Sequence, residues 1–224
     1  MSNTSEQHLH IVSFDIPYPA NYGGVIDVFF RIKELHKRGV KIHLHCFEYG
    51  REHSDYLESF CHSVNYYKRE TKVTKLFNSL PYIVCSRDCE QLRENLRKDN
   101  YPILLEGLHC CSILTHPDFQ NRNVIVRAHN VEHEYYEHLS KAEVDAKKKL
   151  YLKQEVSKLK DFETVLYKAK AILAISQKDY EYFSEKYKNV YKVTAYNAYT
   201  EVDILEGSGD YVLYHGNLSV AENY

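Results

Sequence analysis

The chain has 224 residues and a formal net charge of −2, with 44% hydrophobic and 27% charged residues. This balance is typical of a globular protein with a substantial core, and the lack of a basic excess argues against a nucleic-acid partner. The length fits one large domain, or one domain followed by part of another.

No apolar run approaches the roughly 18 residues that are needed to cross a bilayer. The polar segment 1–7 lacks the apolar stretch of a secretory signal. We therefore expect a cytoplasmic protein with at most peripheral contact at the inner face of the membrane. The segment 73–80, with Lys72 and Lys75, is the candidate for that contact, and a surface helix with no membrane role is the favoured alternative for it. We expect reduced thiols at six scattered positions, which are Cys46, Cys61, Cys85, Cys89, Cys110 and Cys111.

The first part of the chain predicts a strand, a helix and a second strand. The apolar run 9–14 is typical of a buried strand, and apolar residues at helical spacing predict a helix over 25–38. Gly39 stands where a C-cap glycine is expected, and the alternating segment 40–47 predicts the second strand. Such a unit opens a parallel α/β sheet. Weaker patterns predict a strand at 64–67, a helix at 73–79 and a helix at 86–98 capped by Ser86.

The remaining segments continue the alternation of strands and helices. The predicted elements are strands at 101–105 and 123–128, one bent helix or two helices over 132–170, a strand at 171–175, a helix at 177–187 capped by Ser176, and a strand at 190–195. We expect a first domain over 1–195, a linker over 196–209, and over 210–224 the truncated start of a second domain, whose first strand is 211–214. The fold class that these elements predict is α/β, with a Rossmann-like parallel sheet flanked by helices.

The loop after the first strand carries Tyr22, Gly23 and Gly24 just before the first helix. Two glycines permit close approach of a ligand to the backbone. A helix N-terminus also presents free N–H groups to an anion such as a diphosphate. The segment matches neither the dinucleotide-binding nor the phosphate-binding glycine motif, so a tight turn without a ligand remains the alternative.

The end of the strand at 123–128 is followed by His129, Asn130, Glu132 and His133. The pattern H-x-x-E-H also occurs in inverted zinc proteases, but that chemistry needs both histidines on one helical face, whereas His129 follows directly on a strand. A histidine facing a cleft and contacting a polyol is the favoured interpretation. A histidine that only caps the helix is the alternative.

Four segments resemble family 4-type glycosyltransferases of the GT-B class, in particular the bacterial members that build cell-surface polysaccharides. They are FDIPYPANYGGVIDVFFRIKELHKRGVKIHLHCF (14–47), VIVRAHNVEHEYYEHL (124–139), KAILAISQKDYEYF (170–183) and YVLYHGNLSVAEN (211–223). The resemblance extends over essentially the whole chain, and its "HNVEHEYY" block is the most specific part.

The resemblance implies two Rossmann-like domains that face each other across a cleft, of which this chain is the N-terminal, acceptor-side one. It implies a metal-independent transfer, usually with retention, from a nucleotide sugar as co-substrate to a glycan or lipid-linked acceptor, with no cofactor and no metal ligand. Gly23, Gly24 and Gly216 would approach the donor diphosphate, and His129 would be catalytic, beside the donor sugar. Tyr22, Asn130 and Ser176 are the further cleft candidates.

Most donor contacts of the family belong to the second domain, so we expect this chain alone to be inactive. Two other functions remain open. One is a non-catalytic α/β module that binds a glycan or a protein, and the other is a zinc hydrolase that uses His129, Glu132 and His133.

Overall fold

The computed structural model describes residues 6–199, 201 and 207–213. Its centre is a seven-stranded parallel sheet in the order β3-β2-β1-β4-β5-β6-β7, which confirms the predicted fold class. The strands are β1 (His8–Ser13), β2 (Lys41–Glu48), β3 (Ser63–Lys68), β4 (Ile103–Glu106), β5 (Val124–Ala128), β6 (Ala171–Ala174) and β7 (Val190–Lys192).

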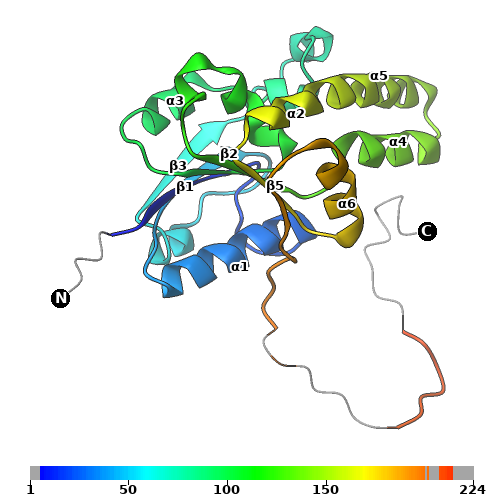
Figure 1. The fold of residues 1–224 in the computed structure, drawn as a ribbon. Helices are drawn as coiled ribbons and strands as arrows, with labels where there is room; N and C mark the ends of the chain where they lie inside the picture. Colours follow the sequence, from blue (N-terminus) through cyan, green and yellow to red (C-terminus); the bar gives the residue numbers. More distant parts are fainter. Residues whose placement is uncertain (1–5, 200, 202–206, 214–224) are drawn as a thin grey trace.

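Helices cover both faces of the sheet (Figure 1). The α-helices are α1 (Gly23–Lys37), α2 (Tyr82–Cys85), α3 (Glu90–Leu96), α4 (Glu132–Ala142), α5 (Ala146–Phe162) and α6 (Gln177–Lys186). The 3-10 helices are η1 (Asp55–Ser59), η2 (Val73–Phe77), η3 (Leu108–Thr115), η4 (Pro117–Phe119) and η5 (Glu163–Lys168). None of these helices combines the length and the apolar character needed to cross a bilayer.

The two faces of the sheet bury separate apolar clusters. On one face α1 packs Val28 and Ile32 against alternate residues of β1 and β2, such as Ile11 and Leu44. On the other face α3, η3, α5 and α6 pack on the intervening residues of the strands, such as Val12. Burial on both faces is why the central strands β4 and β5 are nearly continuous apolar runs in the sequence.

Several local predictions are confirmed. Gly39 follows the C-cap of α1 at φ +80°, a conformation that glycine adopts without strain. The Ser176 hydroxyl accepts a hydrogen bond from the Asp179 amide and caps α6. The long segment after β5 forms two α-helices, α4 and α5, that pack side by side. All six cysteines are free thiols.

Other predictions were wrong in detail. Ser86 does not begin a helix: it lies at the C-cap of α2, and its hydroxyl accepts a hydrogen bond from Arg69 Nε. The expected helix at 73–79 is the short 3-10 helix η2, whose Phe77 is 87% exposed. Tyr211–Leu213 are exposed and form no strand, while Tyr214 and Gly216 lie outside the described residues.

A buried chain of hydrogen bonds crosses the amino-terminal half of the sheet. Asn95 donates to the Tyr67 hydroxyl, which lies 2.7 Å from His45 Nδ1. His45 Nε2 is 2.9 Å from His10 Nδ1, and His10 Nε2 is 2.9 Å from Asp99. If each group donates to the next, both imidazoles are neutral and every ring nitrogen has a partner.

The free energy of unfolding is expected to fall in mild acid because of the histidines in these hydrogen bonds. Burial, with the nearby His10 and His43, lowers the pKa of His45 to about 3. Below the ordinary histidine pKa of about 6.5 the unfolded chain binds a proton that folded His45 does not bind, so stability is lost as the pH falls from there. From pH 7 to pH 4.5 the loss at His45 is about 3 kcal/mol.

Urea unfolding at the two pH values measures this loss. The variant His45→Gln should lose much less stability over the same interval, whereas His138→Gln, at an exposed position of α4, should behave like the unchanged protein. Equal acid sensitivity in His45→Gln would contradict the assignment.

Candidate functional site

A cleft opens at the carboxyl ends of the strands, at the point in the sheet where the strand order reverses. β1 lies between β2 and β4, so the connections after β1 and β4 leave toward opposite faces and create the crevice in which open α/β sheets bind ligands. The cleft has a volume of about 480 Å³. Its lining residues are Phe14, Tyr22, Gly23, Gly24, Asp27, His109, His129, Asn130, Glu132, Tyr135, Tyr136, Ile175 and Ala195.

The structure brings five of the seven predicted site residues to this cleft: Tyr22, Gly23, Gly24, His129 and Asn130. Ser176 follows the lining residue Ile175, but its hydroxyl is bound to Asp179 of its own helix. Helix capping therefore accounts for Ser176. Gly216 lies outside the described residues.

The two glycines at the start of α1 differ in what surrounds them. A Cβ on Gly24 would lie 2.7 Å from the Phe14 ring, so packing within the protein already requires glycine there. A Cβ on Gly23 would meet nothing within 4 Å. Tyr22, the N-cap residue, makes no side-chain cap, and the first turn has no acidic residue. The N-terminus of α1 thus keeps the free N–H groups that attract an anion.

Below the cleft lies a buried network of charges that the sequence analysis missed. Arg127 donates to both carboxylate oxygens of Asp27 at 3.0 Å, and Arg31 donates to Asp27 at 2.7 Å. Arg31 also pairs with Glu106, and Glu106 accepts from His129 at 3.0 Å if His129 Nε2 carries its proton. The signal in the sequence was charge at apolar positions: Asp27 and Arg31 on the buried face of a helix, Glu106 and Arg127 in buried strands.

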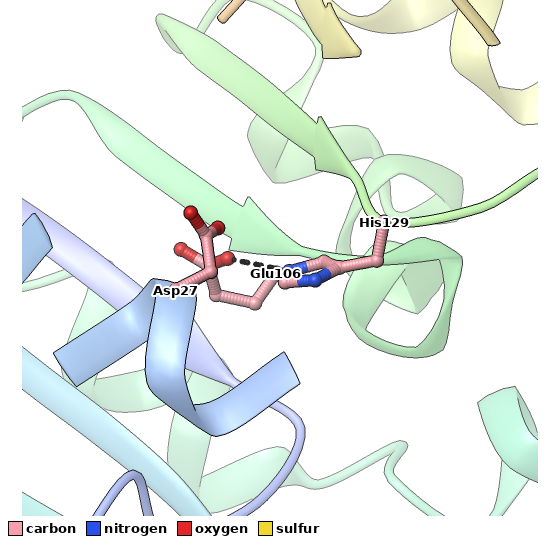
Figure 2. A group of neighbouring side chains, drawn as sticks. All are labelled: Asp27, Glu106 and His129. Atoms are coloured by element: carbon pink, nitrogen blue, oxygen red, sulfur yellow. Dashed lines mark hydrogen bonds and ion pairs between the residues drawn. The ribbon is translucent and has the colours of Figure 1, made fainter. Parts of the chain in front are cut away.

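The network orients His129. Its Nε2 points to Glu106 and its ring meets the Phe14 ring edge to face, with the centroids 5.3 Å apart. Figure 2 shows the His129 ring directed at Glu106, beside Asp27. A neutral His129 that donates through Nε2 keeps Nδ1 as an acceptor. A histidine whose ring is fixed by a carboxylate can hold a substrate hydroxyl or receive its proton.

Asp27, Glu106 and His129 also place three possible metal-ligand atoms within 4.8 Å of one another. However, the two carboxylates already face the two guanidinium groups of Arg31 and Arg127. Burial would raise the pKa of Asp27, but the two arginines outweigh it and hold that pKa at about 2. The charges balance without a cation, and a divalent ion would meet both arginines. The donor set does not fit a metal site.

The H-x-x-E-H residues do not converge on a zinc site. His129 is bound to Glu106, whereas His133 Nδ1 lies 3.3 Å from Glu163. Glu132 lies beside His109. The group of possible metal ligands found among the described residues is Asp27, Glu106 and His129, and it includes neither Glu132 nor His133.

No family model matches the sequence. The chain is 35% identical over 149 residues to an uncharacterised 44.6 kDa protein in the cps region of Klebsiella pneumoniae, a match that covers 63% of this chain and 38% of that protein.

Three solved structures share the fold. Sucrose-phosphate synthase from Thermosynechococcus elongatus matches with a TM-score of 0.52 and 16% identity, over 84% of this chain and 48% of its own. A UDP-glucosyltransferase from Polygonum tinctorium matches with a TM-score of 0.51 and 13% identity, over 87% of this chain and 54% of its own. Phytolacca americana UGT2, in complex with UDP-2-fluoro-glucose and pterostilbene, matches with a TM-score of 0.50 and 13% identity, over 85% of this chain and 54% of its own.

At these identities the likeness shows the fold alone. The chain spans about half the length of the structures that it matches, and 38% of the relative from Klebsiella. It has the Rossmann-like α/β fold that GT-B glycosyltransferases contain, over a stretch that corresponds to about half of such an enzyme.

Proposed function

We propose that this chain is the N-terminal, acceptor-side part of a glycosyltransferase that moves a sugar from a nucleotide-sugar donor to a glycan or lipid-linked acceptor. The observation that carries the proposal is the cleft at the reversal of strand order, which combines the uncapped glycine N-terminus of α1 with the carboxylate-oriented His129. Anion binding suits a diphosphate, and the histidine suits a sugar hydroxyl.

In this proposal Gly23 and Gly24 lie along the donor diphosphate, and His129 contacts the donor sugar. The complex of Phytolacca americana UGT2 with UDP-2-fluoro-glucose shows that the fold is used with a nucleotide sugar, which supports the donor class. Membership of family 4, retention at the anomeric carbon, a polysaccharide product and a site at the inner face of the membrane rest on the sequence resemblance.

Metal independence is supported by the balanced charges below the cleft, where Arg31 and Arg127 already pair with Asp27 and Glu106. We also propose that residues 1–224 alone do not turn over. A transferase stabilises the departing diphosphate through contacts from both sides of its cleft, and one side cannot supply them all.

Titration calorimetry of the full-length protein with UDP-, ADP- and GDP-glucose in the presence of EDTA tests the proposal. We expect one donor to bind and the chain of residues 1–224 to bind it at least tenfold more weakly. NMR of the product then reports the anomeric configuration. If no nucleotide sugar binds while glycans do, the protein is a glycan-binding module instead. If EDTA abolishes transfer, metal independence is wrong.

A further inference from the structure

Two polar atoms in the wall of the cleft lack a hydrogen-bond partner among the described residues: Nδ1 of His109 and Oε1 of Glu132. They lie 3.7 Å apart, which is too far for a direct hydrogen bond. Glu132 is only 3% exposed, and both residues line the same cleft as His129. Native proteins keep few unpaired polar groups of this kind, so each one calls for a partner.

The backbone is shaped to hold the imidazole of His109 at this place. Gly107, between β4 and η3, has φ +71°, which favours glycine. A Cβ on Gly107 would also lie 2.9 Å from His109 Nδ1. The loop therefore accommodates the His109 ring at the cleft only with glycine at position 107. On the other side, Glu132 is fixed as the first residue of α4.

Burial favours the neutral form of both groups. Burial raises the pKa of Glu132 to about 8. Burial, together with the charge of Arg87, holds the pKa of His109 well below its ordinary value. A neutral carboxyl and a neutral imidazole each offer one donor and one acceptor, as does a hydroxyl group. Both atoms are closed to a water-sized oxygen in this structure. A hydroxyl oxygen can bridge them, about 2.8 Å from each, once the two side chains part enough to admit it.

We propose that His109 and Glu132 form a hydroxyl-binding subsite that recognises one sugar unit of the reaction. This inference rests on the proposed function, and it adds two residues whose role is to select a sugar by one of its hydroxyl groups. The hydroxyl comes either from the donor sugar or from the acceptor. Both lie in the same cleft during transfer, and the chemistry of recognition is the same.

Full-length Glu132→Leu and Glu132→Gln, with UDP-glucose and UDP as probes, test the subsite. Glu134→Gln is the matched control, since Glu134 lies on the same helix and is paired at the surface with Lys178. If the donor sugar occupies the subsite, Glu132→Leu weakens UDP-glucose binding about 10-fold or more and leaves UDP binding unchanged. If the acceptor does, donor binding is unchanged and the acceptor KM rises by a similar factor. Glu132→Gln, which keeps a donor and an acceptor, should retain most of the binding.

Thermal unfolding supplies a second readout that needs no ligand. Because Oε1 of Glu132 is buried without a hydrogen-bond partner among the described residues, Glu132→Leu should raise the midpoint by about 2–4 °C. A lower midpoint would overturn the inference, because it would show that Glu132 is a satisfied structural residue. The inference would also be overturned if the donor Kd and the acceptor KM of Glu132→Leu lay within twofold of the Glu134→Gln values. That result is expected if only an ordered water fills the subsite. If the unchanged protein binds no nucleotide sugar, the proposed function fails instead.

Discussion

Replacing Arg127 by methionine is expected to lower the free energy of unfolding by about 3–5 kcal/mol. Arg127 is fully buried, and its guanidinium balances the charge of Asp27 while donating to the carbonyls of Val193 and Thr194. Methionine fills a similar volume but leaves two buried carboxylates, Asp27 and Glu106, that share the one guanidinium of Arg31 among the described residues. Urea unfolding at pH 7 measures the loss.

Two variants test whether charge balance is the cause. Arg97→Met removes an arginine that is 39% exposed and paired with Glu90 and Asp118, and it should cost less than about 1 kcal/mol. The double variant Asp27→Leu/Arg127→Met leaves the pair Arg31–Glu106 and should cost less than the sum of the two single changes. A strictly additive result would mean that the charges are not coupled.

Replacing His129 by alanine in the full-length enzyme is expected to lower kcat by about 10²–10³-fold. His129 is the proposed contact to the donor sugar, and its ring is held by Glu106 at 3.0 Å. The change leaves the four charges below the cleft in place, so the fold should survive. Steady-state transfer with the donor found by calorimetry measures the effect, and circular dichroism confirms folding.

His138→Ala is the control for this experiment, since His138 is an exposed histidine on α4. It should leave kcat unchanged. Glu106→Gln should weaken transfer as well, because the amide no longer offers a charged acceptor to orient the His129 ring. Full activity in His129→Ala would remove this histidine from the mechanism.

The sequence was sufficient for the fold because its periodicities are strong. All seven strands were predicted, the central ones as apolar runs and β2 from its alternation, and α1 was predicted with its cap glycine at Gly39. Prediction failed where two turns compete. Ser86 resembled an N-cap, but Pro81 is the N-cap of the short helix α2, and Ser86 is the C-cap of the same helix.

The candidate site was predictable only in part. Tyr22, Gly23, His129 and Asn130 follow strand ends, and parallel strands end at one edge, so their meeting in one cleft follows from the topology. Glu106 and Asp27 were missed because each pairs with an arginine far along the chain, which no local pattern contains. Glu106 pairs with Arg31, 75 positions away, and Asp27 pairs with Arg127, 100 positions away. The contact of Gly24 with a ligand stays a prediction, and the structure adds a second reason for glycine there, since a Cβ would lie 2.7 Å from the Phe14 ring.

The backbone amide of Tyr196 donates to Asp27 at 2.8 Å, and Arg127 donates to the carbonyls of Val193 and Thr194. The chain that leaves the sheet is therefore fastened at the floor of the cleft. A segment that follows can reach at most about 3.3–3.6 Å farther for each residue added. Insertions after Tyr196 would lengthen the reach of the following segment and leave the cleft intact. An insertion between Lys192 and Tyr196 would instead shift the bound amide and carbonyl groups away from Asp27 and Arg127. The contacts of Asp27 and Arg127 with residues 193–196 thus mark the stretch in which the length of the chain is restricted.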